Sequence, residues 1–460
     1  MTSSSRPLTA WGRSSRTQSR LWPIRHEDDA TRALAAAGPR GAIARGYGRS
    51  YGDACLNDRG DVLDTTGLQG IRAFDEATGV LECAAGTAFA DVMRACLPRG
   101  WMPATCPGTA VVSMGGAIAN DVHGKNQHVA GSFGDHLDWF DLLLPDGRQQ
   151  RVTREDDASL FAATVGGIGL TGIVLGLQFR LQRVPSNALE MREERVPDID
   201  TFLERLQASE REYPYVVGWI DALSPGRDMG RGVLELARPA EADVRGGEPM
   251  RIPVPFEFPQ FVMNRHTVGA FNTLYYHRVP RGGRTRRIHV ERFLYPLDAL
   301  TDWNRMYGRA GVYQFQCVVP HADGRRAIVA LLEAAIRSRG ASFLAVLKSM
   351  ARTGIGMLSF PMPGFTLALD FPRRAETARL LTELQDIALD HGGRVYLAKD
   401  ACIDAATLRR MYPRTAEFEA VLQRVDPGQR MQSDMARRLG LLRTADDGLA
   451  MEPGIGKGTH

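Results

Sequence analysis

Two glycine-rich stretches constrain this chain more than any other feature. They are Ala44–Asp53, ARGYGRSYGD, and Cys106–Asn126, CPGTAVVSMGGAIANDVHGKN. Glycine lets backbone approach a ligand closely, and successive backbone N–H groups in such turns bind anions. One such loop would be equally consistent with a tight turn. Two loops that both end in polar residues favour the pyrophosphate of a nucleotide cofactor.

The first stretch does not fit the common dinucleotide motif. That motif places G-x-G-x-x-G between a strand and a helix of a βαβ unit. Here Gly46-Tyr-Gly48-Arg-Ser-Tyr51 lacks the third glycine, and the polar residues that follow show no amphipathic helical pattern. The sequence therefore argues against a Rossmann site.

Length and composition set broad limits on the class of protein. A chain of 460 residues is too long for one core, so two domains are expected. With 44% hydrophobic and 24% charged residues the composition is that of a soluble globular protein, and a net charge of +4 gives no argument for nucleic acid. The six cysteines show no C-x-x-C spacing and are expected to be free thiols, with no metal site.

No apolar run is long enough to span a membrane, and the N-terminus has no apolar signal region. We therefore expect a cytoplasmic protein or one bound peripherally at the inner membrane.

Hydrophobic periodicity predicts short elements in the first part of the chain and longer ones after about residue 185. Residues 1–20 are rich in Ser and Arg and are expected to be loosely ordered, as is the tail after Leu442. The expected strands are 41–45, 62–63, 79–85, 137–144, 173–184, 213–221, 313–319, 343–348 and 365–371. The expected helices are 28–37, 89–99, 157–164, 199–207, 323–339 and 376–391.

Four of the later strands alternate polar and apolar residues, which is typical of antiparallel strands with one face on a core. In three of these strands the polar positions include Gln314, Gln316, Lys348 and Asp370, and in the fourth Trp219 shares a face with Tyr215 and Val217. This face could form the floor of a substrate site or could meet solvent. Periodicity alone slightly favours solvent.

Nine short motifs, given below in chain order, together resemble the decaprenylphosphoryl-β-D-ribose 2-oxidase family of the vanillyl-alcohol oxidase superfamily. The resemblance extends from about Trp11 to Leu442, and the combination of HGKN, AKD and SDMARRL is specific. The motifs are GRSYGD (48–53), PGT (107–109), GGAIANDVHGKN (115–126), GSFG (131–134), GLTGI (169–173), FPMPG (360–364), AKD (398–400), MYP (411–413) and SDMARRL (433–439).

The resemblance implies an α+β, two-domain vanillyl-alcohol-oxidase-type fold with an antiparallel-sheet substrate domain. The FAD-binding domain would comprise residues 1–186 and 394–442, the substrate domain residues 187–393, and residues 443–460 a disordered tail. The implied reaction oxidises the ribose 2-hydroxyl of a polyprenyl-phosphate sugar to a ketone. A separate short-chain dehydrogenase/reductase would complete the epimerisation that yields the arabinose donor for cell-wall polysaccharide.

Lys399 matches the catalytic lysine of the family. Beside a flavin and away from water its pKa would fall, so that it could accept a proton. The sequence alone would favour an exposed lysine paired with Asp400. His123 matches a flavin contact, although a histidine in such polar surroundings is equally often a structural hydrogen-bonding residue.

The resemblance also implies contacts to cofactor and substrate. The implied cofactor contacts are Arg45, Gly46, Tyr47, Gly48, Arg49, Ser50, Tyr51, Gly52, Asp53, Gly108, Ser113, Met114, Gly115, Gly116, Asn120, Asp121, Val122, His123, Ile173 and Tyr396. The implied substrate contacts are Tyr51, Trp219, Gln314, Gln316, Lys348 and Ala368.

Two departures from relatives bear on chemistry. Arg49 stands where several members of the superfamily carry a histidine attached to FAD, so we expect noncovalent FAD. Ala368 stands where mycobacterial members of the family carry a cysteine, which leaves the pocket shape and the substrate open. The alternatives are an aldonolactone- or alditol-type oxidase of the same superfamily and a non-catalytic protein that keeps the fold.

Arg278–Arg292, RVPRGGRTRRIHVER, carries six arginines and one acidic residue and follows the aromatic-rich stretch Phe256–Tyr276. A solvated charged loop is the ordinary interpretation of such a run. We expect instead a mobile basic flap that contacts an anionic membrane surface, since a lipid-phosphate substrate must leave the membrane to reach a flavin.

Overall fold

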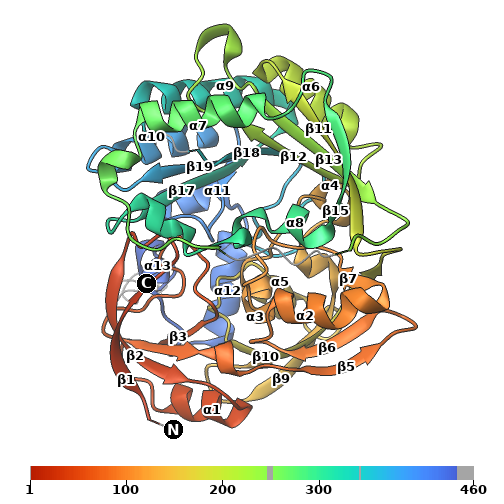
Figure 1. Ribbon diagram of the computed structural model, residues 1–460. Helices are drawn as coiled ribbons and strands as arrows, with labels where there is room; N and C mark the ends of the chain where they lie inside the picture. The colour runs from red at the N-terminus through yellow and green to blue at the C-terminus, as the bar shows by residue number, and fades with distance from the viewer. Residues whose placement is uncertain (1, 246–251, 341–342, 443–460) are drawn as a thin grey trace, which may run out of the picture.

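The computed structural model describes residues 2–245, 252–340 and 343–442. Two halves are stacked, with the N-terminal strands in the lower half and a large sheet in the upper half (Figure 1). Helices late in the chain, among them α12, return to the lower half, so the halves are linked more than once (Figure 1). The borders expected after residues 186 and 393 stay a prediction.

The lower half contains an N-terminal sheet and a central sheet. The N-terminal sheet has the order β1-β2-β4-β3, with β1 and β2 antiparallel and the other pairs parallel. The central sheet has the order β5-β6-β10-β8-β9, with β7 also on β10, and its pairs are antiparallel. The strands are β1 (Ser4–Thr9), β2 (Arg16–Pro23), β3 (Ala42–Arg45), β4 (Asp61–Asp64), β5 (Ile71–Asp75), β6 (Val80–Ala84), β7 (Trp101–Pro103), β8 (Leu137–Leu143), β9 (Gln149–Thr153) and β10 (Ile173–Arg183).

The upper half is built on the large sheet, an antiparallel sheet with the order β15-β11-β13-β12-β18-β19-β17-β20. A short parallel pair, β14 (Ile252–Pro253) and β16 (Leu300–Thr301), lies apart from it. The strands of the large sheet are β11 (Ala188–Val196), β12 (Tyr215–Ile220), β13 (Gly232–Pro239), β15 (Arg284–His289), β17 (Val312–Val319), β18 (Ala345–Met350), β19 (Gly364–Pro372) and β20 (Arg394–Val395).

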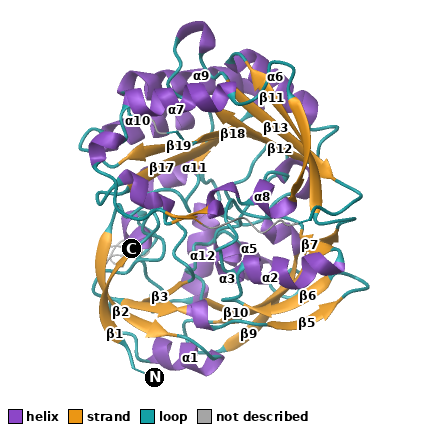
Figure 2. Ribbon diagram, in the orientation of Figure 1, coloured by secondary structure: helices purple, strands orange, loops and turns teal. Residues whose placement is uncertain are grey.

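Helices cover one face of the large sheet and leave the other face toward the lower half. Helices α6, α9 and α10 pack on its outer face (Figure 2). The helices are α1 (Glu27–Ala35), α2 (Phe89–Cys96), α3 (Met114–Ala119), α4 (Gln127–Ala130), α5 (Ala158–Thr164), α6 (Ile199–Ser209), α7 (Arg265–His277), α8 (Val290–Leu294), α9 (His321–Ser338), α10 (Thr377–Asp390), α11 (Ala405–Met411), α12 (Thr415–Val425) and α13 (Asp434–Arg438).

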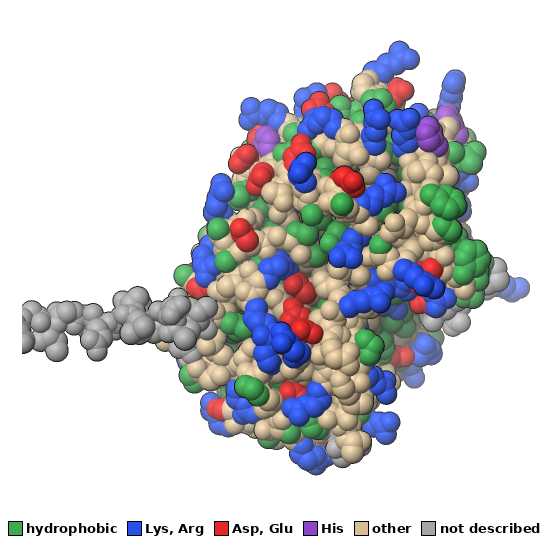
Figure 3. Space-filling model, turned by 90° about the vertical axis from the view of Figure 1, so that its left-hand side faces the viewer, with side chains coloured by type: hydrophobic (Ala, Val, Ile, Leu, Met, Phe, Trp, Pro, Cys, Tyr) green, Lys and Arg blue, Asp and Glu red, His purple; other side chains and the backbone are tan. Residues whose placement is uncertain are grey.

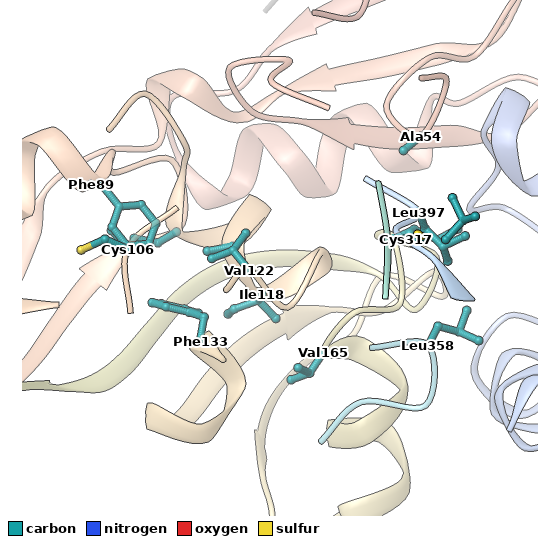
Figure 4. Close-up of a cluster of buried hydrophobic side chains, with 14 of the residues drawn as sticks. Ala54, Phe89, Cys106, Ile118, Val122, Phe133, Val165, Cys317, Leu358 and Leu397 are labelled. Carbon is teal, nitrogen blue, oxygen red and sulfur yellow. The ribbon is translucent and has the colours of Figure 1, made fainter. Parts of the chain in front are cut away.

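The core of the lower half packs directly beneath the second glycine-rich stretch. Figure 4 shows Ile118 of α3 and Val122 between Phe133 and the rest of the cluster, with Cys106 and Phe89 on one side. The rings of Phe89 and Phe133 meet edge to face with centroids 5.8 Å apart. This packing fixes the backbone of the stretch from below.

A half-buried arginine, Arg438, ties the C-terminal segment to the first glycine-rich stretch. Arg438 of α13 donates to Asp53 Oδ1 at 2.7 Å and to Asp400 Oδ2 at 2.9 Å. Both carboxylates are buried. The arginine offsets the cost of burying them and holds the segment that carries Lys399 against the first loop.

The prediction of a loosely ordered N-terminus was wrong for the described residues. Strands β1 and β2 pair over residues 4–21, and the polar residues Thr17 and Ser19 are buried. Trp22 donates to Asp61 Oδ1 at 2.6 Å, which anchors β2 to β4. A polar strand carries no hydrophobic periodicity, so sequence patterns miss it. The expected tail, residues 443–460, lies outside the described residues.

The prediction of a mobile flap at Arg278–Arg292 was also wrong. Residues 284–289 form strand β15, which pairs with β11 at the edge of the large sheet. Glu193 of β11 is fully buried and accepts from Arg278 and Arg284, each at 2.5 Å, while Arg286 lies 3.2 Å away. Three of the six arginines are thus bound to one carboxylate, whose place beside them the sequence spacing could not show.

No helix among the described residues is both long enough and apolar enough to cross a membrane.

Candidate active site

A cavity of about 860 Å³ lies between the glycine-rich loops of the lower half and the inner face of the large sheet. This volume is at the upper end of the range for cofactor and ligand pockets, roughly 300–1,000 Å³. The expected site residues that line it are Gly46, Tyr47, Gly48, Arg49, Ser50, Tyr51, Gly108, Ser113, Gly115, Gly116, Asn120, Val122, His123, Trp219, Gln314, Gln316, Lys348, Ala368, Tyr396 and Lys399.

The two glycine-rich loops touch each other at the cavity wall. A Cβ on Gly46 would lie 2.3 Å from Ser113 Oγ, so only glycine allows this approach. Gly48 has φ +63°, in the left-handed region. A Cβ on Gly108 would meet nothing within 4 Å, because this residue faces the open cavity. This part of the wall therefore presents backbone, which suits close approach of a ligand.

Sheet register places the expected substrate residues in adjacent rows. Trp219 pairs with Val346, Val346 with Ala368, and Ala368 with Gln316. The neighbouring row pairs Gln314 with Asp370. Because side chains in paired positions share a face, this polar face lines the cavity. The alternative that it merely meets solvent was wrong.

Lys399 extends into the cavity from the loop after β20. Its Nζ lies 4.2 Å from the centre of the Tyr51 ring, and the Tyr51 N–H donates to Ala398 O at 2.9 Å. Burial lowers the pKa of Lys399 to about 8, while attraction to Asp370 opposes that shift. Asp400 is bound to Arg438, so the alternative of a surface pair between Lys399 and Asp400 does not hold.

Asp370 is a buried acid at the site that the sequence analysis did not assign. It is 0% exposed, accepts from Gln314 Nε2 at 2.5 Å and from Tyr307 Oη at 3.3 Å. Burial raises the pKa of its carboxyl to about 7, while the two hydrogen bonds and Lys399 act in the opposite direction. The sequence did hold a signal for Asp370, because an acidic residue stood at a polar position of an alternating strand, as Gln314 does.

A second cluster of charge lies near His123. Lys348 donates to Gly124 O at 3.3 Å, and Lys125 donates to Phe293 O. Burial, together with Lys125 and Lys399, lowers the pKa of Lys348 to about 7, and burial lowers that of Lys125 to about 8. Lys125 also lines the cavity, although the sequence analysis left it out. The pair suits an anionic group such as a phosphate.

His123 is a neutral side chain packed against two aromatic rings that stack on each other. Its ring centroid lies 5.1 Å from that of Tyr396 and 5.3 Å from that of Phe360. Burial first, then Lys348 and Lys399, holds its pKa well below the usual value. Gln316 Nε2 donates to His123 Nε2 at 3.2 Å, so the imidazole proton is assigned to Nδ1.

Six expected cofactor residues lie behind the lining, and their contact with a cofactor stays a prediction. Arg45 donates to Thr9 O at 2.7 Å and Asp53 accepts from Arg438. Asp121 accepts from Ser359 Oγ at 2.5 Å and from Gly134 N at 3.0 Å. The six are Arg45, Gly52, Asp53, Met114, Asp121 and Ile173.

The cavity wall holds polar atoms that match a flavin nucleotide. Three buried side-chain atoms, Arg49 Nε, Asn120 Oδ1 and His123 Nδ1, have no hydrogen-bond partner among the described residues. Buried polar groups are normally paired, so such atoms in a pocket wall indicate a polar ligand. Donors, an acceptor and a glycine wall together fit the ring edges and pyrophosphate of FAD.

Comparison with known proteins decides the family. A protein of Mycolicibacterium smegmatis (strain ATCC 700084 / mc(2)155) described as decaprenylphosphoryl-beta-D-ribose oxidase is 36% identical over 451 residues. The alignment covers 95% of this chain and 97% of that protein. The chain belongs to the decaprenylphosphoryl-beta-D-ribose oxidase family.

Further matches agree with this family. The FAD binding domain model matches residues 24–153, and the D-arabinono-1,4-lactone oxidase model matches residues 365–439. An uncharacterized protein of Streptomyces coelicolor is 34% identical over 75% of this chain and 97% of its own length. Cytokinin dehydrogenase 7 of Oryza sativa subsp. japonica is 27% identical over 38% of this chain and 35% of its own. This member of the decaprenylphosphoryl-beta-D-ribose oxidase family is an FAD-dependent oxidoreductase of the vanillyl-alcohol oxidase type.

Proposed function

We propose that this protein oxidises the ribose 2-hydroxyl of decaprenylphosphoryl-β-D-ribose, or of a closely related polyprenyl-phosphate sugar, to a ketone. The observation that carries the proposal is one cavity that joins the glycine-rich loops to Lys399 and to the polar face of the large sheet. The name of the 36% identical relative supplies the substrate class.

Lys399 is the proposed base. When bound, FAD supplies a two-electron acceptor that takes hydride from the carbon bearing the hydroxyl. Loss of that hydride requires removal of the hydroxyl proton, and a lysine with a pKa of about 8 is substantially neutral near that pH. Asp370 then stabilises the protonated ammonium, since the two groups attract each other.

The other polar residues would bind the sugar and the phosphate. Gln314 and Gln316 present amide groups to the cavity that suit hydroxyl groups of a sugar. Lys348 and Lys125 form the cationic end that suits the phosphate. Trp219 would pack against the apolar part of the substrate, and Ala368 leaves room between Gln316 and Val346.

Noncovalent FAD is part of the proposal. The Arg49 guanidinium lies 4.1 Å from the centre of the Trp11 ring, and arginine cannot form the histidyl link found in some relatives. Two further partners follow from the reaction. A short-chain dehydrogenase/reductase would reduce the ketone on the other face, and an anionic membrane would present the lipid substrate.

Anaerobic mixing of the yellow holoenzyme with polyprenyl-phosphoryl ribose tests the proposal. The flavin absorbance should bleach, and borodeuteride reduction of the product should place deuterium at C2 of the sugar. Deuterium at another carbon would contradict the assigned position.

The second candidate, an aldonolactone oxidase, is favoured only by the family match at residues 365–439. A water-soluble aldonolactone should leave the flavin oxidised under the same conditions. Bleaching by the lactone and not by the lipid sugar would establish this second candidate instead.

A further inference from the structure

Large apolar side chains lie exposed on one segment of the upper half. Phe256 is 61% exposed, Phe261 76% and Leu274 of α7 74%. Most of the exposed large hydrophobic residues in the described parts of the chain lie between Ile252 and Leu300. Exposed apolar groups gathered in this way mark an interaction surface more often than a single exposed leucine does.

This apolar surface is continuous with the cavity. The Phe271 ring of α7 is 42% exposed and also lines the cavity, where its centroid lies 5.4 Å from that of Phe343. Leu300 pairs with Ile252 and lines the cavity as well, and both are exposed. The surface therefore borders the cavity mouth and leads inward past Trp219.

The charge around the surface is cationic. Residues 258–290 contain six arginines and no Asp or Glu. Glu193 binds three of them. Among the described residues no carboxylate lies within ion-pair distance of Arg265, Arg281 or Arg287, and all three are exposed. In Figure 3, apolar side chains lie near the right-hand edge of the molecule, with Lys and Arg side chains above and below them.

We propose that this α7 surface, formed by Phe256, Phe261 and Leu274 with Arg265 and Arg281, docks onto an anionic lipid bilayer. The apolar residues would enter the boundary between headgroups and acyl chains, and the arginines would contact the anionic headgroups. A second copy of the chain is a poorer occupant, because a two-fold contact would bring arginines together, and Glu257, the acid next to Phe256, is already paired with Arg13.

Docking to a membrane rests on the proposed function, because the polyprenyl chain of the proposed substrate is held in a membrane. Docking of the α7 surface would turn the cavity mouth toward the bilayer. The chain of the substrate could then remain among Phe271, Phe343 and Trp219 while its phosphate reaches Lys348. No part of the apolar chain would need to cross water.

Co-sedimentation of the holoenzyme with vesicles tests the proposal without any substrate. The vesicles contain phosphatidylglycerol and phosphatidylcholine, and a second set contains phosphatidylcholine alone. The variant Phe256→Ser/Phe261→Ser/Leu274→Ser should bind the anionic vesicles at least 10-fold more weakly than wild type. The matched control Ile71→Ser/Val129→Ser removes exposed apolar side chains elsewhere and should bind within about twofold of wild type.

Arg265→Ser/Arg281→Ser should bind phosphatidylcholine vesicles as wild type does and should lose most of the additional binding to anionic vesicles. Flavin absorbance and circular dichroism confirm that each variant is folded. Equal vesicle binding by wild type and the triple variant would overturn the proposal. So would a wild-type protein that stays in the supernatant, or a wild-type dimer that the triple variant converts to monomer.

The result is separable from the proposed function. Turnover in detergent solution depends on the cavity, whereas vesicle binding depends on the α7 surface. Vesicle binding without bleaching by the lipid sugar supports the surface and contradicts the substrate. Bleaching in detergent without vesicle binding contradicts the surface alone.

Discussion

Lys399 in the cavity and the buried Asp370 beside it shift each other's pKa. Burial disfavours the charged form of both groups, which lowers the pKa of the lysine to about 8 and raises that of the acid to about 7. Their mutual attraction favours both charged forms. The account therefore predicts that the acid acts on the reaction through the pKa of the lysine.

Asp370→Asn should shift the pH dependence of flavin reduction. In the wild type the rate should rise with pH to a plateau, with a midpoint near 8, because Lys399 must be neutral to accept a proton. The variant removes the attraction that raises the pKa of Lys399, so the midpoint should move to lower pH. Stopped-flow absorbance under anaerobic conditions measures it. An unchanged midpoint would contradict the coupling.

The same variant should change the pH dependence of stability. The pKa of Asp370 is raised above the unfolded value near 3.9, so the folded state holds a proton that the unfolded state has lost. Stability then falls as pH rises from about 4 to about 7, and is regained as pH falls. Asp370→Asn should flatten this part of the curve, as measured by denaturation at several pH values.

At the scale of elements, strand β15 depends on one carboxylate. Glu193→Gln removes the charge that binds three arginines. We expect a loss of about 1–3 kcal/mol in unfolding free energy, the cost of leaving buried polar partners unmatched. Glu190→Gln on the same strand is the control, since Glu190 and its partner Arg238 are both exposed and such pairs contribute about 0–1 kcal/mol. If Glu193→Gln unfolded in urea at the same midpoint as the wild type, this role of Glu193 in holding β15 would be contradicted.

The second glycine-rich loop can be tested at Gly108. A Cβ there meets no protein atom within 4 Å, so Gly108→Val should leave the thermal midpoint of the apoprotein nearly unchanged. Because Gly108 lines the cavity where the cofactor is expected, FAD affinity should fall by about 10-fold or more. Gly282→Val, which is equally open but far from the expected cofactor, is the control. Undiminished FAD affinity in Gly108→Val would place the cofactor elsewhere.

Sequence patterns predicted the elements whose periodicity is strong. The expected strands at 313–319 and 365–371 correspond to β17 and β19, and the expected helix at 323–339 to α9. The polar strands β1 and β2 were missed because backbone pairing holds them and neither presents an apolar face. Helix α7 was missed because Gly269 and the β-branched Thr267, Val268 and Thr273 have low helix propensity.

The site was predictable where a motif identified it and not where distant segments meet. HGKN and AKD singled out His123 and Lys399, which line the cavity, and their roles stay predictions. Asp370 was visible only as a polar residue in an alternating strand, since its role depends on the register of β19 with β17. Lys125 lies in the HGKN motif but was not predicted to line the cavity. The role of Glu193 could not be predicted, because it depends on the pairing of β11 with β15.

At the scale of the whole molecule, the cofactor should be held by the fold and not by a covalent bond. The first loop carries Arg49 at the position of the linking histidine, and the HGKN motif contains no cysteine. Acid precipitation of the holoenzyme should therefore release all the yellow colour into the supernatant. Flavin that stays with the denatured pellet would show a covalent link.

The central claim is that this cavity oxidises a polyprenyl-phosphate ribose with Lys399 as the base. The most direct test is the anaerobic rate of flavin reduction by polyprenyl-phosphoryl ribose in wild type and in Lys399→Met, with FAD content measured in both. The account predicts that both proteins bind FAD, that the wild type bleaches, and that the variant bleaches on the order of 10²-fold more slowly. A wild type that stays yellow, or a variant that holds FAD and bleaches at the wild-type rate, would contradict it.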